Sequence, residues 1–216
     1  GNGNYSYIDN LQEAQKVLVQ EFGGTLFTIA KDVKFQLEFN PAYVKAYRLI
    51  GYENRILDKE DFNNDAKDAG DMGSGHTVTA LYELIPAGSD ENTGSVDPLK
   101  YQSEQKSEKA DVSDEMLTIK LRYKEPDGVK SRLYEKPVKA EKDLPAVNSD
   151  RFMFSAAVAS FGMLLRNSDY KGSITYDDVI KMANNSRGTD EDGYKGEFIR
   201  LVKLAKQQDP GNRGNN

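Results

Sequence analysis

The stretch Leu117-Thr118-Ile119-Lys120-Leu121-Arg122-Tyr123-Lys124 alternates apolar with polar side chains. A period of two places the apolar residues on one face of a half-buried β-strand and the polar residues on the other. The turn-forming residues Glu125-Pro126-Asp127-Gly128 follow, and a second run of strand-forming residues occupies Ser131 to Val138. These residues predict an antiparallel β-hairpin.

Further strands are predicted upstream of this hairpin. The alternation of Val33, Phe35, Leu37 and Phe39 with polar residues predicts a strand over 33–39, and Asn40-Pro41 interrupts it. A second strand, Tyr43 to Tyr52, is expected to form an antiparallel pair with the first, and Thr77 to Ile85 is expected to be a third. We therefore expect an α+β fold with five or more mostly antiparallel strands, as a β-sandwich or a curved sheet.

The period becomes helical after Pro145. Ser149 is the expected N-cap of a helix that continues to Arg166 and is apolar nearly all round, as in a helix packed on several sides. Thr175 and Asp178 have the spacing of a capping box for a helix through Met182, and a third helix is expected from Tyr194 to Lys206. These helices are expected to pack on the sheet in a common core.

The first residues have the pattern of a strand followed by a helix. Tyr5 to Ile8 reads as a short strand, and Asp9, with Gln12 three residues on, reads as the N-cap of a helix. The apolar stripe of that helix comprises Leu11, Ala14, Leu18 and Phe22. One such unit cannot bury both faces of its strand, so we expect it to belong to a larger α/β sheet.

The patterns divide the chain into four parts. These are the strand–helix unit at 1–24, an antiparallel β-rich domain at 25–145, a helical subdomain packed on the sheet at 146–208, and a flexible tail at 209–216. Within the β-rich domain, residues 87–114 have almost no large apolar side chain and are expected to form a mobile loop, because they cannot offset their ordering entropy.

Composition excludes several classes of function. The formal net charge is −6 with no cluster of Lys and Arg, which argues against nucleic acids and anionic membranes as partners. There is no apolar run of the roughly 18 residues that a membrane-spanning helix needs. Cysteine is absent, which excludes disulfides, thiolate metal sites and thiol catalysis. Proteins or glycans remain as the expected partners.

One acidic segment resembles the opening of a calcium loop. Asp61, Asn63 and Asp65 carry oxygen ligands at alternate positions. However, Ala66 replaces the glycine that the sharp turn needs, and Met72 stands where the bidentate glutamate is required. We interpret the segment as a solvated acidic loop.

His76 is the only histidine and lies in Gly73-Ser74-Gly75-His76, where glycines suit tight backbone geometry at the entrance to a strand. We interpret it as structural. No Gly-x-Ser-x-Gly elbow is present for a serine nucleophile. The alternative is a carboxylate-dependent hydrolase, which requires His76, Asp61 and Asp65 to converge.

Two further patterns have structural readings. The glycines of Gly70-x-x-Gly73-x-Gly75 lack the Lys-Ser/Thr of a phosphate loop and precede a strand. Tyr43, Lys45 and Tyr47 are suited to a glycan-binding strip on an outer sheet face, but such aromatic residues more often stabilise cross-strand packing. We assign no catalytic, cofactor-binding or metal-binding residue in this chain.

Several blocks resemble the exit of a bacterial von Willebrand factor type A domain and the uncharacterised C-terminal domain that follows it in a family of envelope proteins. The blocks are Asn10–Ala14, Phe22–Lys34, Phe39–Pro41, Tyr47–Arg55, Asp61–Asn63, Asp68–Gly70, Gly75–Glu83 and Gly193-Tyr194. By this resemblance, residues 1–24 are the last strand and helix of the type A domain.

The resemblance implies an upstream adhesion module with a divalent metal held by an Asp-x-Ser-x-Ser loop. No such loop occurs here, so no metal ligand is carried over and no cofactor is expected in this chain. The family implies a lipoprotein-type signal and a place in the periplasm or on the outer surface. The expected role is a non-catalytic scaffold that flanks the module and contacts a protein partner, without touching the membrane itself.

Overall fold

The structure is a computed structural model that describes residues 7–22, 24, 27–51, 56–91, 113–140 and 149–209. The chain forms two compact units. The first comprises Gly1–Tyr47, Asn54–Val78 and Leu84–Ala140, and the second comprises Arg48–Glu53, Thr79–Glu83 and Glu141–Asn216. Neither unit is one continuous piece of the chain, because the division passes through both strands of a β-ribbon.

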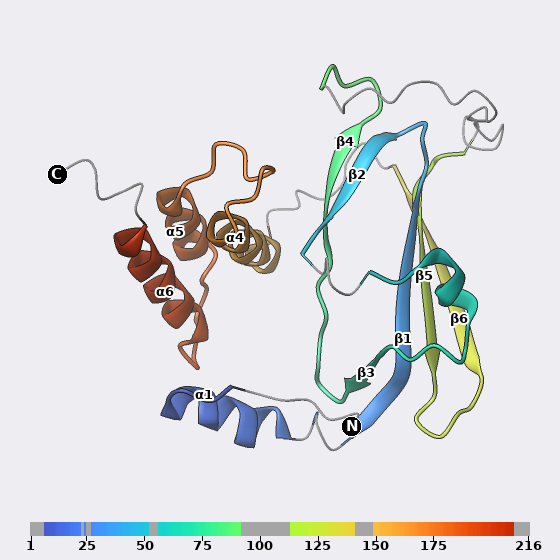
Figure 1. Cartoon of the computed structure of the whole chain (residues 1–216), viewed down its shortest axis with the longest axis horizontal. Helices are drawn as coiled ribbons and strands as arrows, with labels where there is room; N and C mark the ends of the chain where they lie inside the picture. The colour runs from blue at the N-terminus through green and yellow to red at the C-terminus, as the bar shows by residue number, and fades with distance from the viewer. Residues whose placement is uncertain are drawn as a thin grey trace. The chain divides into compact units, whose positions relative to one another are not determined.

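The fold is α+β, as predicted. In the part of the chain that is described, six strands form two antiparallel sheets, neither of them closed, and three helices follow (Figure 1). The larger sheet has the order β3-β1-β5-β6, and the smaller one pairs β2 with β4. None of the helices described is long and apolar enough to cross a membrane.

The predicted hairpin is confirmed. It consists of β5 (Glu115–Lys124) and β6 (Ser131–Lys139), which pair antiparallel from Lys124 with Ser131 outward. The N–H of Gly128 donates to the carbonyl of Glu125 at 2.9 Å and closes the turn. Local signals suffice here because turn chemistry and alternation determine the register together.

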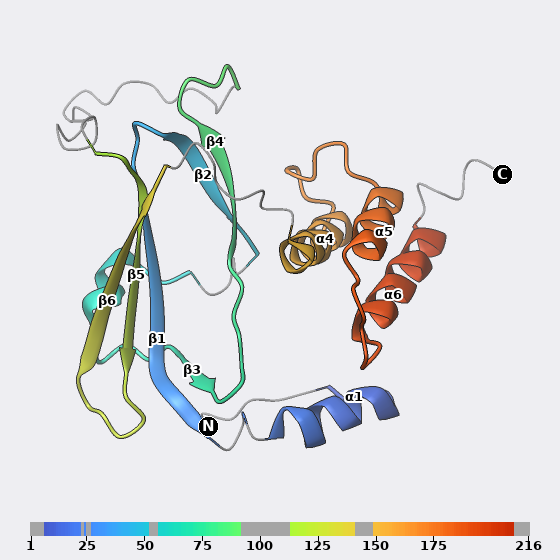
Figure 2. The ribbon, with the colours of Figure 1, turned by 180° about the vertical axis from the view of Figure 1, so that it is seen from behind.

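Strand β1 (Thr28–Phe39) is longer than the predicted strand over 33–39 and lies between β3 and β5 (Figure 2). Asp32 interrupts the regular alternation with a φ of 51°, and the pairing with both neighbours shifts there. Asp tolerates this left-handed conformation better than most residues. The bulge explains why the alternation alone did not indicate the first part of the strand.

The predicted pairing of the first two strands is wrong. Strand β2 (Val44–Ile50) pairs with β4 (Leu81–Pro86) and not with β1. The N–H of Asn40 donates to the carbonyl of Met116 at 2.8 Å, and its side-chain amide donates to the carbonyl of Glu115 at 2.8 Å. These bonds keep the end of β1 beside β5, while the turn after Asn40 leads β2 out of that sheet.

Two short elements were not predicted. The 3₁₀ helix η3 (Lys59–Asn63) lies in the acidic segment, and β3 (Gly70–Gly73) pairs antiparallel with β1. Glycine is unfavourable in strands, so the sequence of β3 does not indicate one. The pairing with β1 is what makes this segment a strand.

The helices of the second unit begin where the sequence predicts. They are α4 (Asp150–Leu165), α5 (Tyr176–Asn185) and α6 (Tyr194–Gln208). Ser149 accepts a hydrogen bond from the N–H of Phe152, and Thr175 with Asp178 forms the capping box. Their buried core consists of Ala157, Val179, Ala183, Ile199 and Val202.

The N-terminal helix differs in its cap. Helix α1 (Leu11–Gln15) continues as a π-helical turn, η1 (Lys16–Gln20), and its N-cap is Asn10 rather than the predicted Asp9. The side-chain oxygen of Asn10 accepts from the N–H of Glu13 at 2.8 Å, whereas the Asp9 carboxylate accepts from the side-chain NH₂ of Asn10.

Tyr7 and Ile8 do not form the expected strand, because strand backbone groups need a neighbouring strand. Residues 5 and 6 of that strand, residues 92–112 of the expected mobile loop 87–114, and residues 210–216 of the expected tail lie outside the described residues.

Candidate functional site

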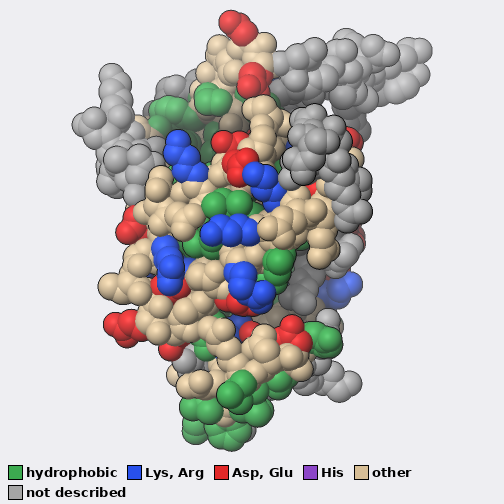
Figure 3. All heavy atoms as spheres, turned by 90° about the vertical axis from the view of Figure 1, so that its left-hand side faces the viewer, with side chains coloured by type: hydrophobic (Ala, Val, Ile, Leu, Met, Phe, Trp, Pro, Cys, Tyr) green, Lys and Arg blue, Asp and Glu red, His purple; other side chains and the backbone are tan. Residues whose placement is uncertain are grey.

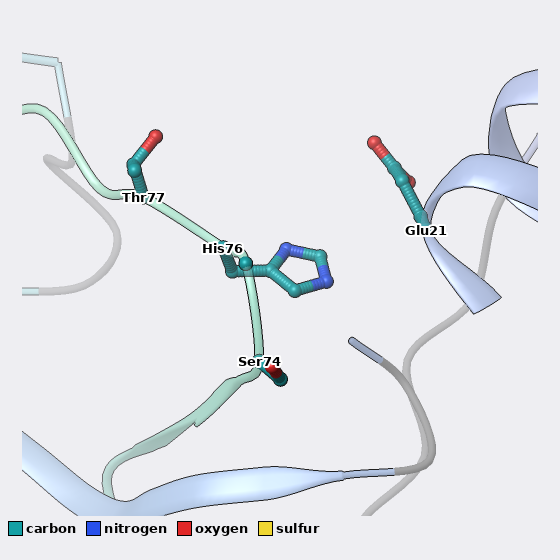
Figure 4. A pocket seen from close by; sticks show the side chains of 5 residues that line it. Glu21, Ser74, His76 and Thr77 are labelled. Atoms are coloured by element: carbon teal, nitrogen blue, oxygen red, sulfur yellow. The ribbon is translucent and has the colours of Figure 1, made fainter. Parts of the chain in front are cut away.

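A small polar cavity surrounds His76. It has a volume of about 250 Å³ and is lined by Glu21, Ser74, Gly75, His76 and Thr77. In Figure 4 the imidazole of His76 extends toward the side of the cavity on which the Glu21 carboxylate lies. Ser74 and Thr77 come from the same loop as His76, which leads from β3 toward β4.

The cavity does not contain the acidic residues that the hydrolase alternative requires. The Asp61 carboxylate lies 2.9 Å from the ammonium of Lys67, and the Asp65 carboxylate accepts from the Ser131 hydroxyl at 2.5 Å. Neither residue lines the cavity of His76. Within the described ranges, no three His, Asp or Glu side chains gather as a metal site. The geometry therefore does not favour hydrolysis.

The segment that resembles a calcium loop is held by the protein's own donors. Arg122 donates to the Asn63 amide oxygen at 3.3 Å and lies 3.5 Å from the Asp65 carboxylate. A hydrogen bond from Ser131 lowers the pKa of Asp65 against a smaller effect of burial, with further contributions from Arg122 and Lys124. The side-chain oxygens of Asn63 and Asp65 face donors on the sheet, and the Asp61 carboxylate pairs with Lys67, so these oxygens do not converge on a shared position for an ion.

Lys34 is the most buried charged residue described, with 4% of its surface exposed. Its ammonium donates to the carbonyls of Asp61 at 3.1 Å and Asn64 at 2.6 Å. A buried ammonium is costly unless it is hydrogen-bonded, and the carbonyls at the C-terminal end of a helix are suitable acceptors. Lys34 therefore holds the end of η3 against the sheet.

Lys124 makes a second attachment of the same loop. Its ammonium lies 2.5 Å from the Asp32 carboxylate and donates to the carbonyl of Asp65 at 2.9 Å. Asp32 also accepts from the N–H of Ala69 at 3.0 Å. Burial raises the pKa of Asp32. The opposite effect is larger, because Lys124 and Ala69 donate hydrogen bonds to the carboxylate and Lys124 and Lys34 place positive charges near it, so the pKa lies below the ordinary value.

We call Lys34, Arg122 and Lys124 the basic clamp, because all three hold residues 58–69 on the polar face of β1 and β5. This cluster was not predicted from the sequence. Its only signal in the sequence was an acidic segment, together with lysines and an arginine at the polar positions of strands that alternate apolar and polar residues. Bringing them together requires the pairing of Lys34 with Arg122 across two strands that are distant in sequence.

The tyrosine strip contacts neighbouring parts of the chain. The Tyr43 hydroxyl donates to the carbonyl of Ser113 at 3.2 Å, and Lys45 donates to the carbonyls of Ser89 and Glu91. The ring of Tyr47 packs on Phe39 with the centroids 4.4 Å apart. These contacts support the interpretation that the tyrosines stabilise packing within the protein, and they do not favour a glycan site.

The second unit has an apolar cavity of about 280 Å³. It is lined by Ile50, Gly51, Ala159, Gly162, Leu165 and Arg166. Nearby, Arg48 forms an ion pair with Glu83, and its guanidinium lies 4.1 Å from the ring centroid of Tyr170. The cavity lacks the convergent polar groups that a catalytic site needs.

Comparison with known proteins identifies relatives without a described activity. The family described as "Uncharacterized protein YfbK, C-terminal" matches residues 24–208. The "Uncharacterized protein YfbK" of Escherichia coli strain K12 is 47% identical over 205 residues, which are 95% of this chain and 35% of that protein. The chain thus spans about a third of the length of this relative. No solved structure matches.

Proposed function

This chain belongs to the family of the C-terminal domain of the uncharacterized protein YfbK, and from this premise we propose that it is a non-catalytic scaffold and protein-interaction domain of a longer bacterial protein. In this proposal it flanks a von Willebrand factor type A module. The module would carry the divalent metal, and the protein would lie in the periplasm or on the outer surface.

The observation that carries the proposal is the apolar stripe on α1 and η1. Its exposed side chains are Leu11 at 85%, Leu18 at 62% and Val19 at 69%. Figure 3 shows apolar side chains gathered over α1 at the bottom of the view. A stable helix normally buries such a stripe against a neighbouring element. An exposed stripe of this kind is typical of a helix that packs on the sheet of a larger domain.

The length of the relative supports the same interpretation. About two thirds of the E. coli protein lie outside the matched region, so ample chain exists to cover the stripe. Exposed apolar surface of this kind marks an interaction site. We propose that the sheet of the type A module packs on the stripe and that the β-rich unit supports the module.

Thiol labelling tests this proposal, because the chain has no cysteine of its own. Leu18→Cys is introduced into the 216-residue chain and into the full-length protein, with other cysteines replaced by serine. We expect maleimide to react at least about tenfold more slowly in the full-length protein, since a packed site reacts only when it opens.

Val129→Cys is the matched control, because Val129 is exposed in the turn between β5 and β6. Its labelling rate should be the same in both proteins. Equal rates for Leu18→Cys in both proteins would remove the proposed docking of the helix. Loss of adhesion-module function in a His76→Ala variant that remains folded would argue for chemistry at His76 and against a scaffold.

A further inference from the structure

The larger sheet has an apolar face that is only partly covered. Phe35 on β1, Leu121 on β5 and Tyr134 on β6 are direct cross-strand neighbours, so their side chains form one row on one face. Phe35 is 50% exposed and Tyr134 is 54% exposed. Since β1 is an inner strand of its sheet, half-exposure of a phenylalanine there is unusual.

The other end of the same face is covered. Phe39 lies four residues further along β1, on the same side, and packs against Tyr47 with the ring centroids 4.4 Å apart. Val44, at the start of β2, is buried with 6% of its surface exposed. The cover therefore extends over Phe39 and leaves Phe35 and Tyr134 open, with Leu121 partly buried between them.

The opposite face of this sheet already has its own cover. Lys34 and Arg122, the neighbours of Phe35 and Leu121 along their strands, point to that other face and hold residues 58–69 through the basic clamp. The loop is therefore not available to close the apolar row. An inner strand with a covered polar face and an open apolar face indicates that a further layer is required.

The rim of the row is basic. Arg132 and Lys136 flank Tyr134 at two residues' distance on β6, so they lie on the same face, and both are exposed. Arg132 pairs with Glu125 at 2.9 Å, but both side chains are solvent-exposed and such a pair is weak. An occupant with carboxylates beside an apolar core fits this rim best.

We propose that the row of Phe35, Leu121 and Tyr134 is a docking surface for an apolar segment flanked by carboxylates, contributed by the part of the full-length protein outside these 216 residues. It rests on the proposed function only in that the chain works within a longer protein. A segment on the same polypeptide is present at roughly millimolar effective concentration, so a small patch suffices for stable docking. A separate protein would need a larger interface than this row offers.

The test uses Tyr134→Cys with Val129→Cys as control, in the 216-residue chain and in the full-length protein. Tyr134→Cys is placed on an edge strand and preserves the buried residues, so the domain is expected to fold. We expect maleimide labelling at this position to be at least about tenfold slower in the full-length protein, and labelling at Val129→Cys to be unchanged.

A second arm tests the charge of the occupant. In full-length Tyr134→Cys protein, the added changes Arg132→Glu and Lys136→Glu should restore fast labelling, whereas Lys130→Glu in the exposed turn should not. Equal labelling of Tyr134→Cys in both proteins overturns the proposal. Labelling of the isolated 216-residue chain that becomes slower as the protein concentration rises also overturns the proposal, because a second copy of the chain would then cover the row.

The outcomes separate this inference from the proposed function. Protection at Leu18→Cys without protection at Tyr134→Cys leaves the scaffold role in place and removes the docking row. Protection at Tyr134→Cys that the two glutamate changes do not affect contradicts the carboxylate-flanked occupant.

Discussion

At the scale of single residues, Asp190 stabilises the start of α6. The helix N-cap is Gly193, which has no side chain to offer. The Asp190 carboxylate is 4% exposed and accepts from the N–H groups of Lys195 at 3.0 Å and Gly196 at 2.8 Å. Arg187 adds an ion pair at 2.9 Å. Asp190 therefore caps the helix from outside it.

We expect Asp190→Ala to reduce the free energy of unfolding of the helical unit by about 2 kcal/mol, because two N–H groups and one guanidinium lose their acceptor. Urea unfolding followed by helical circular dichroism measures this change. Glu191→Ala, at the exposed neighbouring position, is the control and should have almost no effect. Equal losses for the two variants would contradict the capping role.

The same carboxylate makes a pH-dependent contribution. Burial raises the pKa of Asp190, but the N–H groups of Lys195 and Gly196 and the charge of Arg187 lower it below the ordinary value. Its stabilisation is therefore complete above about pH 4 and is lost as the pH falls through the lowered pKa. The stability difference between the wild type and Asp190→Ala should therefore be smaller at pH 2 than at pH 6. These pH values lie about two units below and above the ordinary pKa of an aspartate. A constant difference would contradict this assignment.

At the scale of elements, Gly162 in the last turn of α4 has open space around it. A Cβ at Gly162 meets no atom within 4 Å, and the residue lines the apolar cavity of the second unit. We expect Gly162→Ala to increase stability by about 1 kcal/mol, because alanine favours a helix over glycine and adds a methyl group where space exists.

Gly196→Ala in α6 is the matched comparison. There a Cβ lies 3.2 Å from the Arg187 guanidinium and 3.3 Å from the Asp190 carboxylate. The gain in helix propensity should be offset by the disturbed ion pair, so the melting temperature should rise for Gly162→Ala and not for Gly196→Ala. Stabilisation of equal size in both would show that propensity alone acts.

The loop held by the basic clamp is the second element with a clear test. Lys34→Met keeps the length of the side chain but removes the ammonium that donates to the carbonyls of Asp61 and Asn64. We expect amide hydrogen exchange in residues 58–69 to accelerate at least about tenfold, since local opening becomes easier. Lys139→Met removes an exposed ion pair with Asp114 and should leave this exchange unchanged.

At the scale of the whole molecule, the two compact units have separate sets of buried residues. Lys34 belongs to the first unit, and Asp190 belongs to the second. Because the two sites share no partner, the losses of stability from Lys34→Met and Asp190→Ala should add to within about 0.5 kcal/mol in the double variant. Urea unfolding of the four proteins measures the sum, and a larger deviation would show that the units are coupled.

The sequence by itself determined the features that arise within a few residues. The hairpin of β5 and β6 follows from alternation and turn chemistry, and the starts of α4 and α5 follow from Ser149 and Thr175. The cap at Asn10 shows the limit of such signals, because Asp9 and Asn10 are both good caps and only backbone geometry distinguishes them. The resemblance of several sequence blocks to an uncharacterised C-terminal domain went beyond these local features, and the match to the YfbK C-terminal family confirmed the resemblance to such a domain.

Only the tertiary structure decided which distant segments meet. The pairing of β2 with β4, the bulge at Asp32, and the burial of Lys34 under η3 depend on contacts between residues far apart in the chain. The half-exposure of Phe35 depends on how far the cover over its sheet extends. A local period shows that a side chain belongs to one face of a strand, but what covers that face is determined by topology.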